Sequence, residues 1–573
     1  PYTDGGIEKA AVNLIAIDKV SVPAGETVET TLTFDKEDLA SYDYKKTKAE
    51  NGGYVLEAGE YEISLRTDSH TYAGGTRTEY ADGSGNYFTF TVSRDVVYDD
   101  GRESDEEAAV NRFDDVSSMM KDTAEKGYAR NFSRADFAGT FPTAPTADDL
   151  DAKNIKVAEQ QNGGTTVYAG LAEFDALTDP TLGNVETSEI YSDTAPVMGA
   201  GNGTMFSALR GKDYEDTAWD TLLDNLTKSE YVSGSFNASA YNTAKLDSIS
   251  KPATSDPDGP AGITSLFGAT GCCAYMSEVV LASTFNEELA EAMGEAIGEE
   301  AYYYGKKADS NVGGTNGWYA PAMNIHRSPF AGRNFEYYSE DPVLSGFMGA
   351  AVVRGAASKG VNCYIKHFAL NDSEIWRTNN LCVWATEQTM RELYLKPFEM
   401  TIKNSEIELK YIGDEEGTVM TKTVKGAFAI MSSFNRLGTT WAGGSYALMT
   451  EVLRNEWGFD GVAISDFNLY EYTDADQGLR AGTDMQLAFG IQYQDETSNT
   501  ALTAMRKAFH NMCYATVHTN VMQGVVPGAT FIYHLAPWQS GLIALSVILY
   551  VATAGCVAWM VIRMMRVRKE KAA

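Results

Sequence analysis

Apolar and polar residues alternate along three stretches of the first 98 residues, at 28–34, 61–65 and 88–92. An alternation of period two places one face of a segment in a core and the other in water, which indicates β-strands. Glycines such as the pair Gly52 and Gly53 separate these stretches and favour turns between them. Residues 1–98 are therefore predicted to form an antiparallel β-sandwich.

From residue 201 to residue 525 the pattern changes to short apolar runs separated by segments of helical periodicity. Strand-like runs lie at 318–322, 361–365, 427–431 and 462–464. Continuous apolar runs of this length are typical of strands that are buried on both faces. Their alternation with helices predicts an α/β fold with a parallel barrel or a doubly wound sheet.

A helix is predicted over residues 286–301. Asn286 can cap its first turn, and Leu289, Met293 and Ile297 recur at every fourth position. We expect these three apolar side chains to face the core.

The remaining segments have other characters. Residues 99–200 combine an acidic cluster with prolines and are interpreted as a linker and irregular insertion. A juxtamembrane segment at 526–539 leads into residues 540–562, which carry no charge and have about the length needed to cross a bilayer. Basic residues dominate 563–573. The positive-inside rule then predicts a single-pass helix with a cytoplasmic tail and the acidic bulk outside the cell. The alternative, a buried core helix, is disfavoured by the basic cluster.

Composition excludes several classes of function. The chain of 573 residues has a formal net charge of -33. Such an acidic protein repels phosphate backbones, so nucleic-acid binding is not expected. The six cysteines include no CxxC pair, so neither a disulfide-built scaffold nor a zinc site is indicated.

Polar residues follow two of the strand-like runs where each run ends. Lys366 and His367 follow 361–365, and Asp466 follows 462–464 after one serine. The carboxyl ends of strands in a parallel barrel meet at one mouth, where active sites are built. A carboxylate, a cation and an imidazole at this mouth suit a neutral polyhydroxylated ligand, because a hydroxyl both donates and accepts hydrogen bonds.

A loop dense in charge is predicted between residues 324 and 336. Arg327, Arg333 and Glu336 lie within it, and Pro and Gly interrupt it. Composition predicts an irregular loop that contains an internal ion pair.

Five motifs in this region carry a resemblance to a known family. They are DGPAG at 258–262, NIHRSPFAGRNFEYYSEDP at 324–342, KHFALND at 366–372, MSSFN at 431–435 and LRNEWGFDGVAISDF at 453–467. In order and spacing these motifs resemble glycoside hydrolase family 3. The N-terminal region is similar to the fibronectin type III-like domain of that family. The resemblance implies a (β/α)8-type barrel preceded by this sandwich, and the transmembrane helix predicted above follows the barrel.

The resemblance implies a retaining exo-β-glycosidase that removes terminal β-linked glucose from an oligosaccharide or an aryl or alkyl glycoside. Asp466 would be the nucleophile and form a covalent glycosyl–enzyme ester that water then breaks. The implied substrate-binding residues are Asp258, Arg333, Glu336, Lys366, His367 and Met431. For Glu336, an ion pair with Arg333 or Arg327 is an equal alternative. No metal or organic cofactor is expected, because two carboxylates suffice for this chemistry.

Two departures from the family pattern bear on function. Phe434 stands where the family commonly has Tyr, which removes one hydrogen bond to the nucleophile. The general acid of the family is usually a Glu on an α/β-sandwich domain, and in the order implied here that domain would lie upstream of Pro1. The general acid is therefore not assigned. The alternative functions are a β-xylosidase-type activity and a membrane-anchored sugar-binding protein without turnover.

Overall fold

The computed structural model describes residues 1–117, 157–162, 165–168, 191–233, 241–265, 270–303, 314–378, 381–438, 440–468, 473–489, 493, 495–532, 535 and 537–572. Within the interval 99–200, which was interpreted as a linker and insertion, residues 118–156, 163–164 and 169–190 lie outside the described part. The same holds for residues 533–534 and 536 of the juxtamembrane segment.

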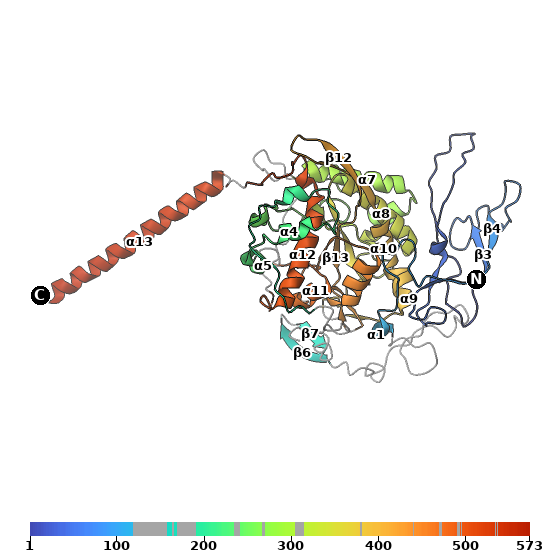
Figure 1. The fold of residues 1–573 in the computed structure, drawn as a ribbon, viewed down its shortest axis with the longest axis horizontal. Coiled ribbons are helices and arrows are strands. Elements are labelled where there is room, and N and C mark those ends of the chain that lie inside the picture. Colours follow the sequence, from blue (N-terminus) through green and yellow to red (C-terminus); the bar gives the residue numbers. More distant parts are fainter. Residues whose placement is uncertain are drawn as a thin grey trace.

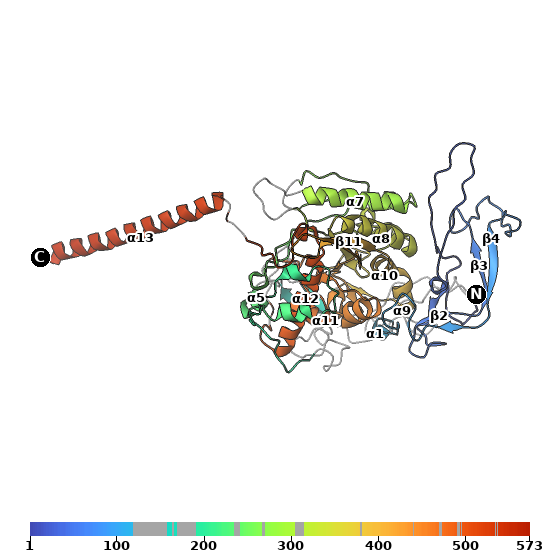
Figure 2. The same cartoon turned by 45° about the horizontal axis from the view of Figure 1, so that its top comes forward.

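The N-terminal region contains five short strands, among the residues described (Figures 1 and 2). Strands β1 (Ser41–Tyr42), β2 (Tyr54–Leu56) and β5 (Val96–Val97) pair antiparallel in the order β1-β2-β5. Strands β3 (Gly59–Ser64) and β4 (Tyr87–Val92) form a separate antiparallel pair. The alternating stretches at 61–65 and 88–92 are thus confirmed as strands, apart from the last residue of the first.

The strand predicted at residues 28–34 is wrong. In the described N-terminal region this stretch has no regular secondary structure, and both Val28 and Leu32 are exposed. A strand is stabilised when a neighbour pairs its backbone groups and covers its apolar face. Alternation shows that a segment could form a strand, but it does not show whether another strand pairs with it. Alternation alone therefore predicts too many strands.

A parallel sheet forms the centre of the larger domain. Strands β8 (Gly317–Trp318), β9 (Asn362–Phe368), β13 (Ala429–Ser432) and β16 (Val462–Ile464) pair in the order β16-β13-β9-β8. Isolated parallel bridges extend the arrangement at both edges, between Asp258 and Tyr319 and between Ile464 and Met485. The runs at 361–365, 427–431 and 462–464 are therefore confirmed as buried parallel strands to within a few residues, whereas of the run at 318–322 only Trp318 lies in a strand, with isolated parallel bridges at Tyr319 and Ala322.

Helices surround this sheet (Figure 1). The long ones are α7 (Glu287–Tyr303), α8 (Pro342–Ser358) and α12 (Asn499–Val517), while a further long helix, α13 (Pro537–Ala572), lies apart from the sheet. The shorter elements are α1 (Asp114–Ser117), η4 (Phe206–Leu209), α4 (Ala218–Leu223), α5 (Lys228–Ser233), η5 (Asp247–Ile249), α6 (Glu278–Ala282), η6 (Asn334–Glu336), α9 (Glu387–Thr389), η7 (Met390–Tyr394), α10 (Lys396–Lys403), η8 (Ala442–Gly444), η9 (Ala447–Glu456), α11 (Ala475–Ala481) and η10 (Asn520–Met522). The remaining strands are β6 (Val157–Asn162), β7 (Thr165–Tyr168), β10 (Cys382–Val383), β11 (Glu406–Ile412), β12 (Val419–Lys425), β14 (Arg436–Leu437) and β15 (Thr440–Trp441).

Helix α7 matches the helix predicted at 286–301. The Asn286 side chain accepts a hydrogen bond from the Leu289 backbone N–H at 3.0 Å, as expected of a cap. Met293 and Ile297 are buried, but Leu289 is exposed and Ala290 faces the core instead. The buried face carries small residues because α8 packs closely against it. A Cβ placed on Gly294 would come within 2.2 Å of a backbone oxygen of α8.

Segment 99–117 packs on the barrel through buried charge. Arg391 of η7 donates to Glu387 at 3.0 Å and to Glu456 at 2.6 Å, and also to the Val110 carbonyl at 2.8 Å. Its guanidinium lies over the ring of Tyr42, 4.7 Å from the centroid. The N-terminal domain and the barrel are therefore joined by an ion cluster from which water is excluded.

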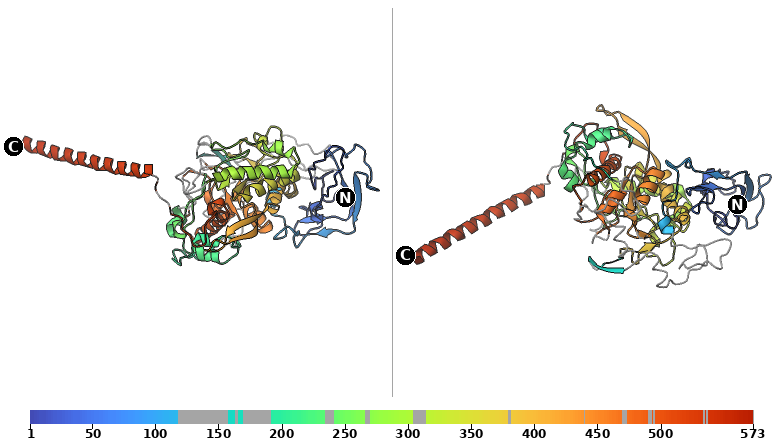
Figure 3. Two further views of the ribbon diagram at one scale, coloured as in Figure 1. Left: turned by 90° about the horizontal axis from the view of Figure 1, so that it is seen from above. Right: turned by 60° about the horizontal axis from the view of Figure 1, so that its bottom comes forward.

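Helix α13 includes all of the predicted span 540–562 and extends away from the rest of the molecule (Figure 3). Its length and apolar composition are sufficient to cross a membrane, and none of its described residues is buried. Membrane insertion itself stays a prediction.

Candidate active site

Asp466 lies two residues beyond the end of β16 and is only 8% exposed. Its Oδ2 accepts a hydrogen bond from Arg377 Nη1 at 2.7 Å, and its Oδ1 accepts one from the Phe467 backbone N–H at 2.7 Å. His367 Nε2 lies 3.8 Å from Oδ2. The carboxylate is thus fixed in orientation by one guanidinium and one backbone group.

Lys366 and Asp258 form a second pair, in which Lys366 comes from β9 and Asp258 from the segment that bridges Tyr319 beyond β8. The Lys366 Nζ lies 3.0 Å from Asp258 Oδ1, and the Gly259 backbone N–H donates to the same oxygen at 2.9 Å. Lys366 and His367 lie within β9, whose last residue is Phe368, rather than in the loop after it. The Asp258 side chain is 31% exposed, which leaves carboxylate surface open to a ligand.

Arg333 and Glu336 form the internal ion pair that was predicted for the loop at 324–336. Burial raises the pKa of Glu336, and the positive charges of Lys366 and Arg333 oppose that shift. Burial alone would lower the pKa of Arg333, but the negative charges around it, Glu336 foremost and Asp466 included, raise it overall.

His367 is buried between positive groups. Burial, followed by the charges of Arg333, Lys366 and Arg377, lowers the pKa of His367 well below its usual value. Asn324 fixes the backbone of His367, because its Oδ1 accepts from the His367 N–H at 2.9 Å and its Nδ2 donates to the carbonyl at 3.0 Å. His367 is therefore a neutral imidazole that can exchange hydrogen bonds with a hydroxyl.

Sequence reasoning missed two charged residues of this group, Glu374 and Arg377. Glu374 Oε2 lies 3.1 Å from Arg377 Nε, and its Oε1 lies 3.7 Å from Arg333 Nη1. Glu336, Arg333, Glu374, Arg377 and Asp466 thus form one chain of alternating charge, called the ion-pair row below. The only signal in the sequence was position, because the loop of Glu374 and Arg377 directly follows the strand that carries Lys366.

Two residues singled out in the MSSFN motif have different surroundings. The Arg377 guanidinium lies over the ring of Phe434, 5.0 Å from its centroid. A phenyl ring in place of a tyrosine therefore supports the arginine that binds Asp466. Met431 pairs in register with Ile464 and lies in a buried hydrophobic cluster, so the structure places it among apolar neighbours rather than in the ion-pair row.

Glu278, the first residue of α6, is a buried carboxyl group close to this site. It is 1% exposed, and within the described residues its Oε2 has no hydrogen-bond partner. The pKa of Glu278 is raised to about 8, chiefly by burial. A hydrogen bond from its own backbone N–H opposes this rise, the negative charge of Glu336 adds to it, and the positive charge of Lys366 opposes it. The folded protein therefore keeps this proton at neutral pH.

Glu278→Gln is expected to stabilise the protein increasingly as the pH rises. The unfolded chain releases the Glu278 proton near pH 4.5 and the folded chain near pH 8, so the parent loses stability between these values. The limiting slope is about 1.4 kcal/mol per pH unit. Gln has no such proton, so the difference in melting temperature between variant and parent should grow from pH 5 to pH 8. A pH-independent difference would contradict the assignment.

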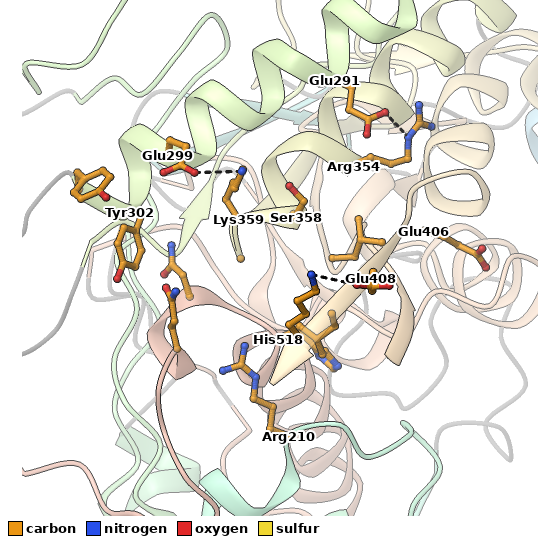
Figure 4. A pocket seen from close by; sticks show the side chains of 18 residues that line it. Arg210, Glu291, Glu299, Tyr302, Arg354, Ser358, Lys359, Glu406, Glu408 and His518 are labelled. Atoms are coloured by element: carbon orange, nitrogen blue, oxygen red, sulfur yellow. Dashed lines mark hydrogen bonds and ion pairs between the residues drawn. The ribbon is translucent and has the colours of Figure 1, made fainter. Parts of the chain in front are cut away.

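A cavity of about 800 Å³ lies elsewhere, near Gly360 at the start of β9 (Figure 4). None of the predicted site residues lines it. Two ion pairs lie in its wall, Arg354 with Glu291 at 3.0 Å and Lys359 with Glu299 at 3.2 Å. The strand end at which the sequence predicts the chemistry carries Asp466 and lies outside this cavity, so Asp466 is kept as the candidate catalytic residue.

Two family models match the chain. The model described as Glycosyl hydrolase family 3 N terminal domain matches residues 222–512, and the model described as Fibronectin type III-like domain matches residues 2–69. These matches agree with the barrel and the N-terminal strands described above.

Individual proteins extend the comparison. Beta-glucosidase A of Butyrivibrio fibrisolvens is 28% identical over 477 residues, which are 82% of this chain and 48% of that protein. A beta-glucosidase of Rhizobium radiobacter is 35% identical over 271 residues, 47% of this chain and 29% of that protein. The solved beta-glucosidase of Paenibacillus barengoltzii superposes with a TM-score of 0.57 at 20% identity, over 88% of this chain and 48% of that one. The chain spans about half the length, or less, of these proteins.

Proposed function

Because the chain belongs to glycosyl hydrolase family 3, we propose that it is a retaining exo-β-glycosidase with Asp466 as its nucleophile. The observation that carries this proposal is the position of Asp466 at the end of a parallel strand, with Arg377 on its Oδ2 and His367 beside it. The Lys366–Asp258 and Arg333–Glu336 pairs supply further donors and acceptors for sugar hydroxyls.

The proposed reaction proceeds in two displacements at the anomeric carbon. An Asp466 oxygen attacks this carbon while the glycosidic bond breaks, which gives a glycosyl ester and releases the leaving group. Water then attacks the same carbon and frees the sugar and the Asp466 carboxylate, and the proton that the water gives up balances the one that the leaving group takes up. Asp258 would accept from a hydroxyl and Lys366 would donate to one. The neutral His367 adds a further hydrogen bond without adding charge.

The proposed substrate is a β-glucoside, because relatives that match 82% and 80% of this chain are beta-glucosidases. A β-xylosidase-type activity is the alternative, and the space beside Asp258 for a hydroxymethyl group distinguishes the two. A sugar-binding protein without turnover is the alternative from another class. Anchoring through α13 with the site outside the cell remains a prediction of the uncharged stretch and the basic residues after it. An upstream α/β-sandwich domain that carries the general acid remains a prediction of the resemblance.

Covalent trapping tests the proposal. The protein is incubated with 2-fluoro sugars that carry a dinitrophenyl leaving group, which departs without a proton donor. Peptide mass spectrometry then locates the label. A label on Asp466 supports a retaining glycosidase, and the sugar that labels fastest identifies the substrate class. The absence of label with every sugar would favour binding without turnover.

Glu374→Gln is expected to lower kcat/KM for a dinitrophenyl β-glucoside about 10- to 100-fold. The amide cannot hold Arg333 and Arg377 as the carboxylate does, and small displacements of catalytic groups have effects of this size. The rate of Asp466 labelling should fall in parallel while the melting temperature stays unchanged. Glu416→Gln, at an exposed position between β11 and β12, is the control, and equal losses in both variants would contradict the role of Glu374.

A further inference from the structure

Four large apolar side chains lie on two loops beside the candidate active site. Phe330 and Phe335, on the segment before α8, are 91% and 58% exposed. Ile375 and Trp376, on the loop after β9, are 65% and 67% exposed. One exposed apolar side chain is ordinary, but a group on adjoining loops indicates a binding surface. These four residues are called the apolar rim.

Contacts between the same loops fix the apolar rim next to Asp466. Arg333 Nη1 lies 3.7 Å from Glu374 Oε1, and a Cβ placed on Gly332 would come within 3.1 Å of Glu374 Cγ. Arg377 follows Trp376 directly and donates to Asp466 at 2.7 Å. The loop that carries Ile375 and Trp376 is therefore part of the wall around the nucleophile.

The backbone at Trp376 has a φ of +64°, in the left-handed region. This conformation costs a residue other than glycine about 1–2 kcal/mol. With the backbone in this conformation, the side chains of Ile375 and Trp376 are exposed to solvent. The residues on either side of them, Glu374 and Arg377, belong to the ion-pair row. Strain that persists beside an active site points to a functional reason for the geometry.

Two polar side chains of the loop around Phe330 have partners within the protein. Asn334 Nδ2 donates to the Ser328 carbonyl at 2.7 Å, and Arg327, itself 57% exposed, lies 3.8 Å from Asp372. The four side chains of the rim are hydrocarbon apart from the indole N–H of Trp376, so the rim presents mainly apolar surface. A sugar unit requires partners for its hydroxyls, whereas a flat apolar group is bound by stacking and by removal of apolar area from water.

Resting on the proposed glycosidase function, we propose that the apolar rim binds the leaving group of the substrate and selects an aryl or other flat apolar group. In a retaining displacement the leaving group departs from the face of the anomeric carbon opposite the nucleophile. With the sugar held by the ion-pair row and the Lys366–Asp258 pair, the leaving group extends out of the polar site toward its rim. Trp376 and Phe330 there offer ring surface for stacking.

Binding of S-linked glycosides, which are not hydrolysed, tests this proposal on the full chain. Methyl and 2-naphthyl thio-β-glucoside share the sugar and differ only in the group at the leaving position. Calorimetry should show tighter binding of the naphthyl compound to the parent. Trp376→Asn should reduce the ratio of the two dissociation constants about tenfold, since stacking and area burial are lost. The affinity for the methyl compound should not change.

The variants are chosen to separate binding from folding. Asn tolerates the left-handed conformation of residue 376, so Trp376→Asn keeps the backbone of the loop. Phe330→Ala should shift the ratio in the same direction. Tyr303→Ala, at the end of α7, removes an aromatic side chain that is likewise 67% exposed and should leave the ratio unchanged.

Labelling of Asp466 by 2-fluoro-glucosyl fluoride, whose leaving group has no apolar surface, monitors the proposed function separately. Failure to label the parent would contradict the glycosidase proposal itself. Normal labelling of Trp376→Asn with an unchanged ratio of dissociation constants would overturn the role of the apolar rim. A selective loss of affinity for S-linked cellobiose would also overturn it, in favour of a sugar as the leaving group.

Discussion

Asp466→Asn is expected to lower the turnover of a dinitrophenyl β-glucoside by at least about 10³-fold, the scale found when a nucleophile is removed. The amide is nearly the same size and can still accept the hydrogen bond from Arg377, so the shape of the pocket is kept. The amide is nevertheless too weak a nucleophile to form the glycosyl ester. Sugar binding, measured by calorimetry with a thioglucoside, should persist within a few-fold.

Azide rescue distinguishes a lost nucleophile from a damaged site. In Asp466→Gly, azide can enter the vacated space, attack the anomeric carbon and displace dinitrophenolate, which yields the α-glycosyl azide. Recovery of turnover with this product would assign the missing nucleophile to residue 466. Asp414→Asn, at a partly exposed position in the turn between β11 and β12, should behave like the parent. Activity of Asp466→Asn equal to the parent would refute the assignment.

Arg391→Leu is expected to lower the free energy of unfolding by about 3–5 kcal/mol, the usual cost of leaving buried charges without their partner. Glu387 and Glu456 are both fully buried and both bind the Arg391 guanidinium. Glu387 also accepts the backbone N–H of Phe113 at 3.0 Å, so the loss extends to the segment that joins the two domains. Urea denaturation followed by circular dichroism measures the effect.

An exposed ion pair supplies the comparison for Arg391. Lys212 and Asp216 lie 3.0 Å apart on the surface, and such pairs contribute about 0–1 kcal/mol. Lys212→Leu should therefore change the free energy of unfolding little. If Arg391→Leu were equally mild, the buried cluster would not be what holds segment 99–117 on the barrel.

The sequence predicted the central sheet well because its strands are buried on both faces. Such strands appear as unbroken apolar runs, and the run at 462–464 coincides with β16. Asp466 could be placed beyond the end of a strand for the same reason, since the end of that run is visible in the sequence. The end of β9 was predicted three residues too early, because Lys366 and His367 are polar but still lie within the strand. The half-exposed stretch at 28–34 failed, because its pattern depends on a neighbour that the sequence does not specify.

Glu374 and Arg377 could not be predicted, because their roles arise only from tertiary contact. Both lie in an irregular loop without periodicity, and the partner of Glu374 is Arg333, 41 positions earlier in the printed sequence. The contact between the Phe434 ring and Arg377 could likewise not be predicted from the sequence. The sequence indicated a lost hydroxyl, whereas the fold shows a ring beneath the arginine that binds Asp466.

The ion-pair row contains three carboxylates, Glu336, Glu374 and Asp466, but only two guanidiniums, Arg333 and Arg377. Lys366 and Asp258 balance each other, and His367 adds no charge. The group as a whole therefore has one more negative charge than it has positive charges. An uncharged sugar enters such a site without repulsion and becomes better matched as positive charge develops at its anomeric carbon. A uronic acid or a sugar phosphate carries negative charge, the same sign as the excess charge of this group, and is repelled, so the feature that would assist the proposed reaction would also favour neutral sugars.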